Sequence, residues 1–204
     1  IMKKTAIFLS VSLLAVQASA QEYYHDGVEV CSNGITYDVK LNFLALILTN
    51  KANSLIYGTW TYPDGSIIKS DHDENLLNTE LEFEENSFKE ALKKTFTKAE
   101  FDKLHAVNGI KFNIYCVIDN DLIIRELDFY MSIYEDPIFL QIPPAKYALL
   151  EKNIKKYVKI EANEYAKKFK YMHATKFVDF SKIQIDYDSE TPGLYTKPAS
   201  QKGP

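Results

Sequence analysis

Arginine is almost absent from this chain. Of the 24 lysine and arginine residues, only Arg125 is an arginine. Clusters of planar guanidinium groups hold phosphates and carboxylates through paired hydrogen bonds, so a binding site built on several arginines is excluded. Arg125 itself has two interpretations. It forms an ion pair with Glu126, Asp128 or another acid, or it anchors the carboxylate of a ligand.

The motifs of the common catalytic sites are also missing. The chain has no Gly-x-Ser-x-Gly elbow and no phosphate-binding loop, and no two of its four histidines have the helical spacing of metal ligands. The segment Asp71–Glu74 gathers carboxylates around one histidine, but it lacks the glycine and the distant glutamate of an EF-hand. We therefore predict no catalytic residues, no metal and no cofactor, which favours a protein that is not an enzyme.

An excess of positive charge is lacking as well. The formal net charge is -4, and it becomes -6 without Lys3 and Lys4, because 22 basic residues then face 28 acids. A protein with this balance is not expected to bind nucleic acid or anionic lipid by electrostatic attraction.

Long apolar runs are confined to the beginning of the chain. Two lysines precede an apolar stretch over residues 6–16, and Ala-Ser-Ala stands before Gln21. This pattern is typical of a secretory signal peptide and is too short for a membrane span. We expect residues 1–20 to be removed and the remainder to be exported, to the periplasm or the extracellular space, without a transmembrane segment.

Residues 21–86 are predicted to be rich in β-hairpins. Asn33-Gly34 is typical of a type I′ turn, and a two-residue loop there pairs Val30 with Tyr37. In Leu41–Thr49, apolar residues occupy odd and even positions alike, as in a strand buried on both faces, although a buried helix segment has the same pattern. A turn at residues 63–65, Pro-Asp-Gly, predicts a further hairpin over residues 55–69.

Residues 87–180 are predicted to form an α-β-β-α-β unit. Ser87 with Glu90, and Thr97 with Glu100, have the spacing of capping boxes that open two short helices. A proline-started helix after residue 143 and an extended segment over residues 168–180 complete the unit.

The two central strands of this unit are the clearest in the chain. Residues 110–118 alternate between apolar and polar, an Asp-Asn-Asp turn follows, and residues 122–133 return. Arg125 falls on the apolar parity of the second strand unless a bulge near Ile124 changes the facing. Residues 181–204 are predicted to be a disordered tail.

The two cysteines, Cys31 and Cys116, leave two possibilities open. Outside the cytosol they could form a disulfide that closes a long loop and stabilises the fold by about 4 kcal/mol. The strand patterns place Cys31 on a polar face and Cys116 on an apolar one, which is instead typical of one exposed and one buried thiol.

These elements predict an α+β fold, in which a β-hairpin-rich N-terminal part packs with the C-terminal α-β-β-α-β unit around a largely antiparallel sheet. The order of elements over residues 87–180 resembles the C-terminal domain of TonB-type proteins. That resemblance implies a periplasmic, non-enzymatic domain that docks to partner proteins, sometimes through an exposed strand. The whole chain, with Ala-Ser-Ala before Gln21 and many Lys, Tyr and Phe, is similar to an uncharacterised family of secreted proteins of anaerobic gut bacteria, which implies an envelope location.

We expect a secreted, non-catalytic envelope protein that binds another protein or a different envelope component. The alternatives are a hydrolase or a carbohydrate-binding module acting on envelope or extracellular glycans. The candidate ligand-binding residues are Arg125 and the aromatic pair Trp60 and Tyr62, whose rings, together with Tyr57, could form a platform for sugars.

Overall fold

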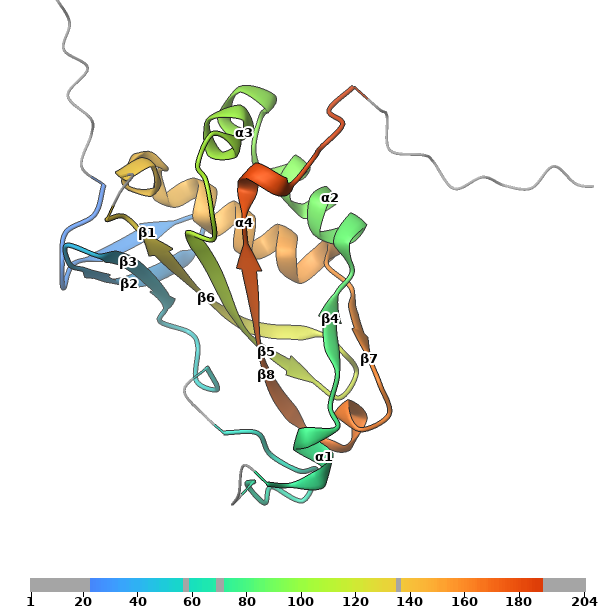
Figure 1. Ribbon diagram of the computed structural model, residues 1–204. Helices are drawn as coiled ribbons and strands as arrows, with labels where there is room; N and C mark the ends of the chain where they lie inside the picture. Colours follow the sequence, from blue (N-terminus) through green and yellow to red (C-terminus); the bar gives the residue numbers. More distant parts are fainter. Residues whose placement is uncertain (1–22, 57–58, 69–71, 135–136, 189–204) are drawn as a thin grey trace, which may run out of the picture.

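The computed structural model describes residues 23–56, 59–68, 72–134 and 137–188 of the 204-residue chain. These residues form a six-stranded antiparallel sheet in the order β1-β2-β3-β6-β5-β8, a separate pair of strands, β4 and β7, and four α-helices (Figure 1). This architecture confirms the predicted α+β class and the largely antiparallel sheet. None of the helices in this part of the chain is both long and apolar enough to cross a membrane.

The strands are β1 (Glu29–Ser32), β2 (Ile35–Leu41), β3 (Ala45–Asn50), β4 (Leu81–Phe83), β5 (Phe112–Asp119), β6 (Ile124–Ser132), β7 (Ile160–Ala162) and β8 (Tyr171–Val178). The helices are α1 (Glu74–Leu77), α2 (Glu85–Thr95), α3 (Lys98–His105) and α4 (Pro144–Tyr157).

The first hairpin has the predicted register. Val30 pairs with Tyr37, and the turn residues Asn33 and Gly34 have φ angles of 52° and 80°, as a type I′ turn requires. The next strand, β3, starts later than expected, at Ala45, and pairs with β6. Because β3 belongs to the N-terminal part and β6 to the C-terminal part, the two parts share one continuous sheet.

The predicted bulge is present between β5 and β6. Val117 pairs with Glu126, but the next residue along β5, Ile118, pairs with Ile124, so Arg125 is the extra residue. The extra residue restores the alternation. Ile124 faces the core, whereas Arg125 is exposed.

One of the two predicted capping boxes is observed. At the start of α3, the Thr97 hydroxyl accepts the Glu100 N–H group, and the Glu100 carboxylate accepts the Thr97 N–H group. The box predicted at Ser87 is wrong, because α2 begins earlier and its N-cap is Glu84, whose carboxylate accepts the Asn86 and Ser87 N–H groups. The Ser87 hydroxyl instead links the Glu84 carbonyl to the Lys159 N–H.

α2 and α4 pack together and cover one face of the large sheet, behind it in the view of Figure 1. As predicted, Pro144 occupies the first turn of α4. The core between the helices and the sheet is aromatic. Phe112 contacts four rings there, with centroid distances of 5.5 to 6.4 Å: Phe129, Phe139, Tyr147 and Phe180.

The predicted disordered tail is wrong for residues 181–188. A 3-10 helix spans Phe180–Lys182, and Ile183 is buried against the core. The side chain of Lys93 on α2 donates to the Asp186 carbonyl at 2.7 Å, which attaches this segment to the helices. Residues 189–204 lie outside the described residues.

Candidate functional site

The second face of the large sheet is not covered by α2 or α4. Side chains alternate between the two faces of a strand, so the residues next to the core positions point away from the helices. We call this side the open face. Two of its large apolar side chains, Tyr115 and Phe177, are 41% and 60% exposed.

Strand pairing aligns the open-face side chains in rows across the sheet. The central row is Asp38, Thr49, Asp128, Tyr115 and Thr175. The next row is Lys40, Ile47, Tyr130, Asn113 and Phe177. Directly opposite Cβ atoms lie about 4.5–5.5 Å apart, so five strands bring hydroxyls, rings and two carboxylates, Asp38 and Asp128, together on one surface.

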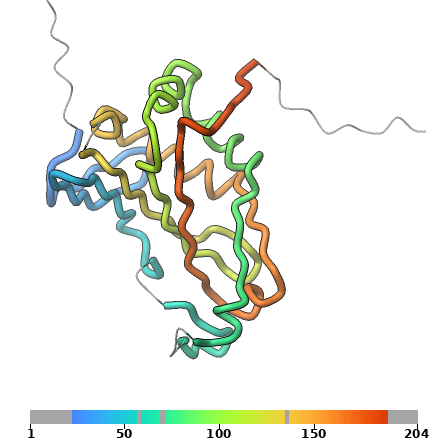
Figure 2. The backbone as a smooth tube through the Cα atoms, viewed as in Figure 1, coloured from blue at the N-terminus to red at the C-terminus, as the bar shows by residue number. Residues whose placement is uncertain are grey.

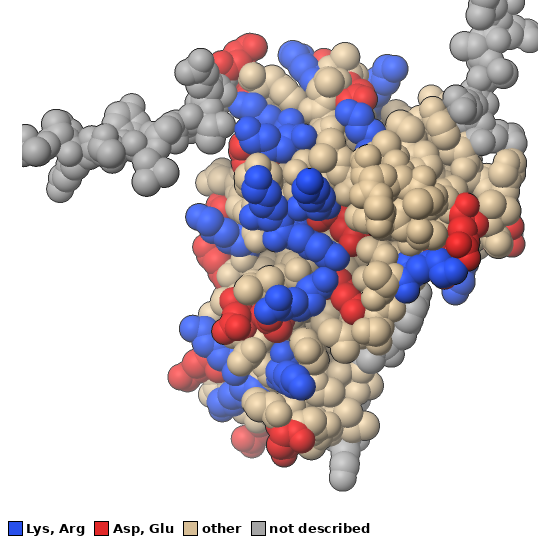
Figure 3. Space-filling model, turned by 180° about the vertical axis from the view of Figure 1, so that it is seen from behind, with Lys and Arg blue, Asp and Glu red and all other residues tan. Residues whose placement is uncertain are grey.

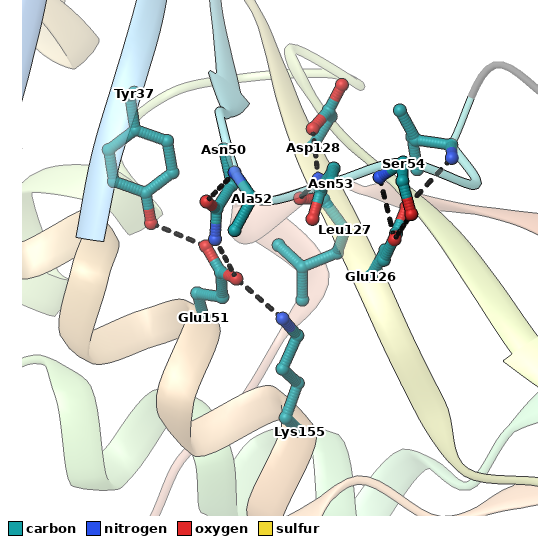
Figure 4. A network of polar contacts seen from close by, with 11 residues as sticks. Tyr37, Asn50, Ala52, Asn53, Ser54, Glu126, Leu127, Asp128, Glu151 and Lys155 are labelled. Carbon is teal, nitrogen blue, oxygen red and sulfur yellow. Dashed lines mark hydrogen bonds and ion pairs between the residues drawn. The ribbon is translucent and has the colours of Figure 1, made fainter. Parts of the chain in front are cut away.

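The chain after β3 forms one border of this surface. We call residues 50–56 the crossing segment, because they pass from the last residue of β3 over the first half of β6 (Figure 4). The Glu126 carboxylate accepts the backbone N–H groups of Ser54, Leu55 and Ile56 at 2.7 to 2.9 Å. Hydrogen bonds to a charged acceptor are the strong ones, so Glu126 fixes the path of this segment.

Two further side chains hold the crossing segment at its start. The Asn53 amide donates to the Leu127 carbonyl and to the Asp128 carboxylate, at 3.0 and 2.8 Å. The Asn50 amide donates at 2.8 Å to Glu151, a carboxylate of α4 that is only 1% exposed (Figure 4).

The buried Glu151 carboxylate has strong partners. It accepts the Tyr37 hydroxyl and the Lys155 ammonium group, each at 2.7 Å. Burial, with the nearby Glu151 charge, raises the pKa of Tyr37 well above its ordinary range. The tyrosine therefore stays a donor, and the network is structural.

A pocket of about 400 Å³ lies on the open face beside the crossing segment. Its size is within the range of small-molecule sites. The side chains that shape it come from β2, β3, β5, β6 and β8 and from the crossing segment: Lys40, Ile47, Ile56, Tyr115, Asp128, Tyr130, His173 and Thr175. Burial lowers the pKa of His173, although Glu126 and a hydrogen bond to the Thr59 backbone oppose the shift.

β8 forms an edge of the sheet, and its free side can be identified from one bridge. Both backbone groups of Tyr171 bond to Thr61, on the side away from β5. Because strand backbone groups alternate in direction, those of His173, Thr175 and Phe177 point outward as well. Among the described residues, no backbone group bonds to these N–H and C=O groups.

β4 runs beside this edge but belongs to the other sheet (Figure 2). A gap of about 260 Å³ between the two strands is lined by Leu81 and Phe83 of β4, by residues 173–175 of β8, and by Trp60. On the helix side, Lys176 spans from β8 to β4, with its Nζ atom 5.8 Å from the Phe83 ring centroid. We call this gap the β8–β4 slot.

The aromatic platform predicted at Trp60 and Tyr62 is wrong. Both rings are half-buried and pack on the fully buried Phe169, with centroid distances of 5.0 and 5.1 Å. They make angles of 84° and 30° with the Phe169 ring, so they are not coplanar with each other. The Tyr62 hydroxyl donates to Asp73 at 2.7 Å. Tyr57 lies outside the described residues.

The hairpin predicted over residues 55–69 is present only as a turn and isolated bridges. Tyr62 and Ser66 bond across the turn at 2.8 Å, and Thr61 bridges to Ile67, but the described residues of this range, 55–56 and 59–68, contain no regular strand. Thr61 also pairs with Tyr171 of β8. The segment therefore serves to connect the crossing segment with the far edge of the sheet.

Of the two roles considered for Arg125, the structure shows the ion pair. Its guanidinium group forms an ion pair with Asp119, a buried carboxylate at the end of β5 that also accepts the N–H groups of Asp121 and Ile123 in the turn. Arg125 therefore stabilises the β5–β6 hairpin, and it does not line the pocket on the open face.

The disulfide considered between Cys31 and Cys116 is not formed. Both cysteines are free, with Cys31 exposed and Cys116 buried. Three strands separate β1 from β5 in the sheet. At about 4.8 Å per strand the two residues lie far beyond the reach of a disulfide.

The acidic segment Asp71–Glu74 has a structural role in its described part. Asp73 caps α1 by accepting the Asn75 and Leu76 N–H groups. Across the described ranges, no group of three or more His, Cys, Asp or Glu residues is arranged to hold a metal ion.

Lysines are prominent on the helix side of the molecule. Figure 3 shows them across the middle of the face opposite to the view of Figure 1, with acidic side chains between them. Pairs along the helices account for part of this pattern, such as Lys89 with Glu85 and Lys94 with Glu90. Because the two signs are interspersed, this side is a mixed surface and not a concentrated site for anions.

The comparisons with known proteins give the fold alone. No family model and no curated protein matches the chain. Among solved structures it is similar to a DUF5043 family protein from Bacteroides uniformis, with a TM-score of 0.57 and 18% sequence identity, over 78% of this chain and 95% of that one. This similarity is consistent with the resemblance to a gut-bacterial family. The TonB-type resemblance and export stay predictions.

Proposed function

We propose that this is an exported, non-catalytic envelope protein that binds an extended segment of another protein along the free edge of β8. The observation that carries the proposal is the outward direction of the backbone groups of His173, Thr175 and Phe177. An unpaired strand edge is a template for a further strand.

The surroundings of the edge favour one kind of segment. In the β8–β4 slot, an added strand would place alternate side chains against Trp60, Leu81 and Phe83, so an apolar residue at every second position fits best. Lys176 spans the helix side of the slot through contacts with Phe83, Phe88 and Glu85, which leaves the open side for entry.

Export rests on the signal-like pattern of residues 1–20, whose apolar stretch follows two lysines and ends before Ala-Ser-Ala. Mass analysis of the natural product tests it. A mature chain beginning at Gln21 is expected, and a chain that keeps the apolar stretch inside the cell contradicts export.

A displayed library of random peptides, selected on the purified protein, tests the docking. Peptides with alternating apolar residues should be enriched. Thr175→Pro removes one outward N–H group and should weaken their binding about tenfold, the worth of one hydrogen bond. Thr175→Val keeps that N–H group and serves as the matched control, with unchanged peptide affinity.

Amide hydrogen exchange provides a second measurement that does not depend on the proline variant. The Thr175 and Phe177 amides should exchange fast in the free protein and become protected when a selected peptide is bound. The proposal is contradicted if no peptide is enriched. It is also contradicted if the valine and proline variants bind a selected peptide equally well and the Thr175 amide of the wild-type protein gains no protection.

A further inference from the structure

The pocket on the open face has polar groups that the protein itself does not use. Tyr115, Tyr130 and Thr175 line it, and within the described residues none of their three hydroxyls forms a hydrogen bond. None of the three hydroxyls is among the buried polar atoms that lack a partner in the described residues, so each is accessible. Each is available to a ligand as both donor and acceptor.

The two tyrosine rings also lack the contacts that rings elsewhere in the molecule make. The aromatic side chains of the core pair with one another, as Phe112 does with Phe129, but Tyr115 and Tyr130 have no ring partner among the described residues. Tyr115 is directly opposite Asp128, and Tyr130 is two residues further along β6. The two residues are therefore diagonal neighbours on one surface, a spacing that long and aromatic side chains can bridge.

The charged side chains that line the pocket balance, apart from His173. Lys40 contributes one ammonium group at one side and Asp128 contributes one carboxylate at the floor. The lowered pKa of His173 keeps its imidazole neutral at pH 7. A pocket without excess charge discriminates against strongly charged ligands, whereas rings and hydroxyls together suit a molecule with both C–H faces and hydroxyl groups.

We propose that this pocket binds a neutral saccharide of one or two sugar rings, stacked on Tyr115 and hydrogen-bonded by Tyr130, Thr175 and His173. A volume of about 400 Å³ suits a ligand of that size. The pocket shares His173 and Thr175 with the β8 edge, but it uses their side chains, whereas strand docking uses the outward backbone of β8.

The test is a titration of the purified protein with neutral monosaccharides and their disaccharides at up to millimolar concentration, with glucose, galactose, mannose and N-acetylglucosamine as the probes. Binding is followed by calorimetry and by the NMR shifts of labelled tyrosine rings. At least one probe should bind and shift the Tyr115 and Tyr130 signals. Tyr115→Ala should weaken it at least tenfold, and Tyr115→Phe, which keeps the ring, about threefold.

Tyr134→Ala is the matched control, because Tyr134 is 68% exposed and does not line the pocket. It should leave sugar binding unchanged, and Tyr115→Ala should leave binding of the selected peptides unchanged, so the two proposals fail separately. Binding of no probe to the wild-type chain overturns the saccharide site. Equal sugar affinity of the wild-type and Tyr115→Ala proteins also overturns it. The same holds if the sugar shifts only the signals of tyrosine rings outside the pocket.

Discussion

The two faces of the six-stranded sheet are built from the same strands but differ in what their side chains contact. On the helix side, rings such as Phe112 and Phe129 are fully buried and pair with other rings. On the open face, Tyr115 and Tyr130 have no ring partner within the part of the chain that the structure describes, and polar side chains lie between them. One face therefore supplies the stability of the fold, and the other carries the surface that is available for binding.

Removing one ring from each face tests most directly whether the two faces contribute differently to stability. Phe112→Ala should lower the free energy of unfolding by about 3–5 kcal/mol, because it leaves a cavity among four aromatic neighbours. Phe177→Ala, on the open face, should change it by less than about 0.5 kcal/mol. Urea denaturation of both variants measures the difference, and similar losses would contradict the assignment of the faces.

The second prediction concerns Glu126, a buried acid of the open face, and its structural role in holding the crossing segment. Glu126→Ala should lower the free energy of unfolding by about 2–3 kcal/mol, because three backbone N–H groups lose a charged acceptor. Limited proteolysis should then cut near residues 54–56. Glu161→Ala, at an exposed position of β7, is the control and should have little effect.

A smaller effect is expected at the junction between α4 and the sheet. Tyr37→Phe removes the hydroxyl that donates to Glu151 and should cost about 1.5–2 kcal/mol, since Asn50 and Lys155 still bond to that carboxylate. Thermal unfolding measures the change. An unchanged stability would show that the network is redundant.

The smallest change is expected in the pH dependence of the free energy of unfolding. Burial lowers the pKa of His173 below its unfolded value, near 6.5. The unfolded chain then takes up the proton first, so this residue makes the fold less stable as the pH falls through 6.5 toward the folded pKa. His173→Gln should flatten the stability profile in that window only. An equal slope in both proteins between pH 7 and 5 would contradict this role.

Most of the strand pairing could be predicted, because it depends on local signals. Asn33-Gly34 specifies the first hairpin, and alternation with one misplaced arginine specifies the bulge at Arg125. Alternation along a strand also puts Glu126, Asp128 and Tyr130 on one face of β6. What it could not predict is that the helices leave this face open, since that depends on contacts between segments distant in sequence.

The candidate site was predicted poorly for the same reason. Trp60 and Tyr62 were favoured because aromatic residues on a strand can form a platform, but both rings pack against Phe169, more than a hundred residues away in the sequence. His173 and Tyr115 carried no local signal of function, and they meet only because β8 pairs with β5. Similarly, Ser87 has the spacing of a capping box, but the preceding Glu84 caps the helix first.

The unequal surroundings of the two thiols make the native chain its own reporter of unfolding. Burial raises the pKa of Cys116 and removes it from solvent, whereas Cys31 is accessible on the edge strand β1. A maleimide dye should therefore attach once, at Cys31, under native conditions. A second attachment would then time the opening of the sheet at its centre, without any engineered label.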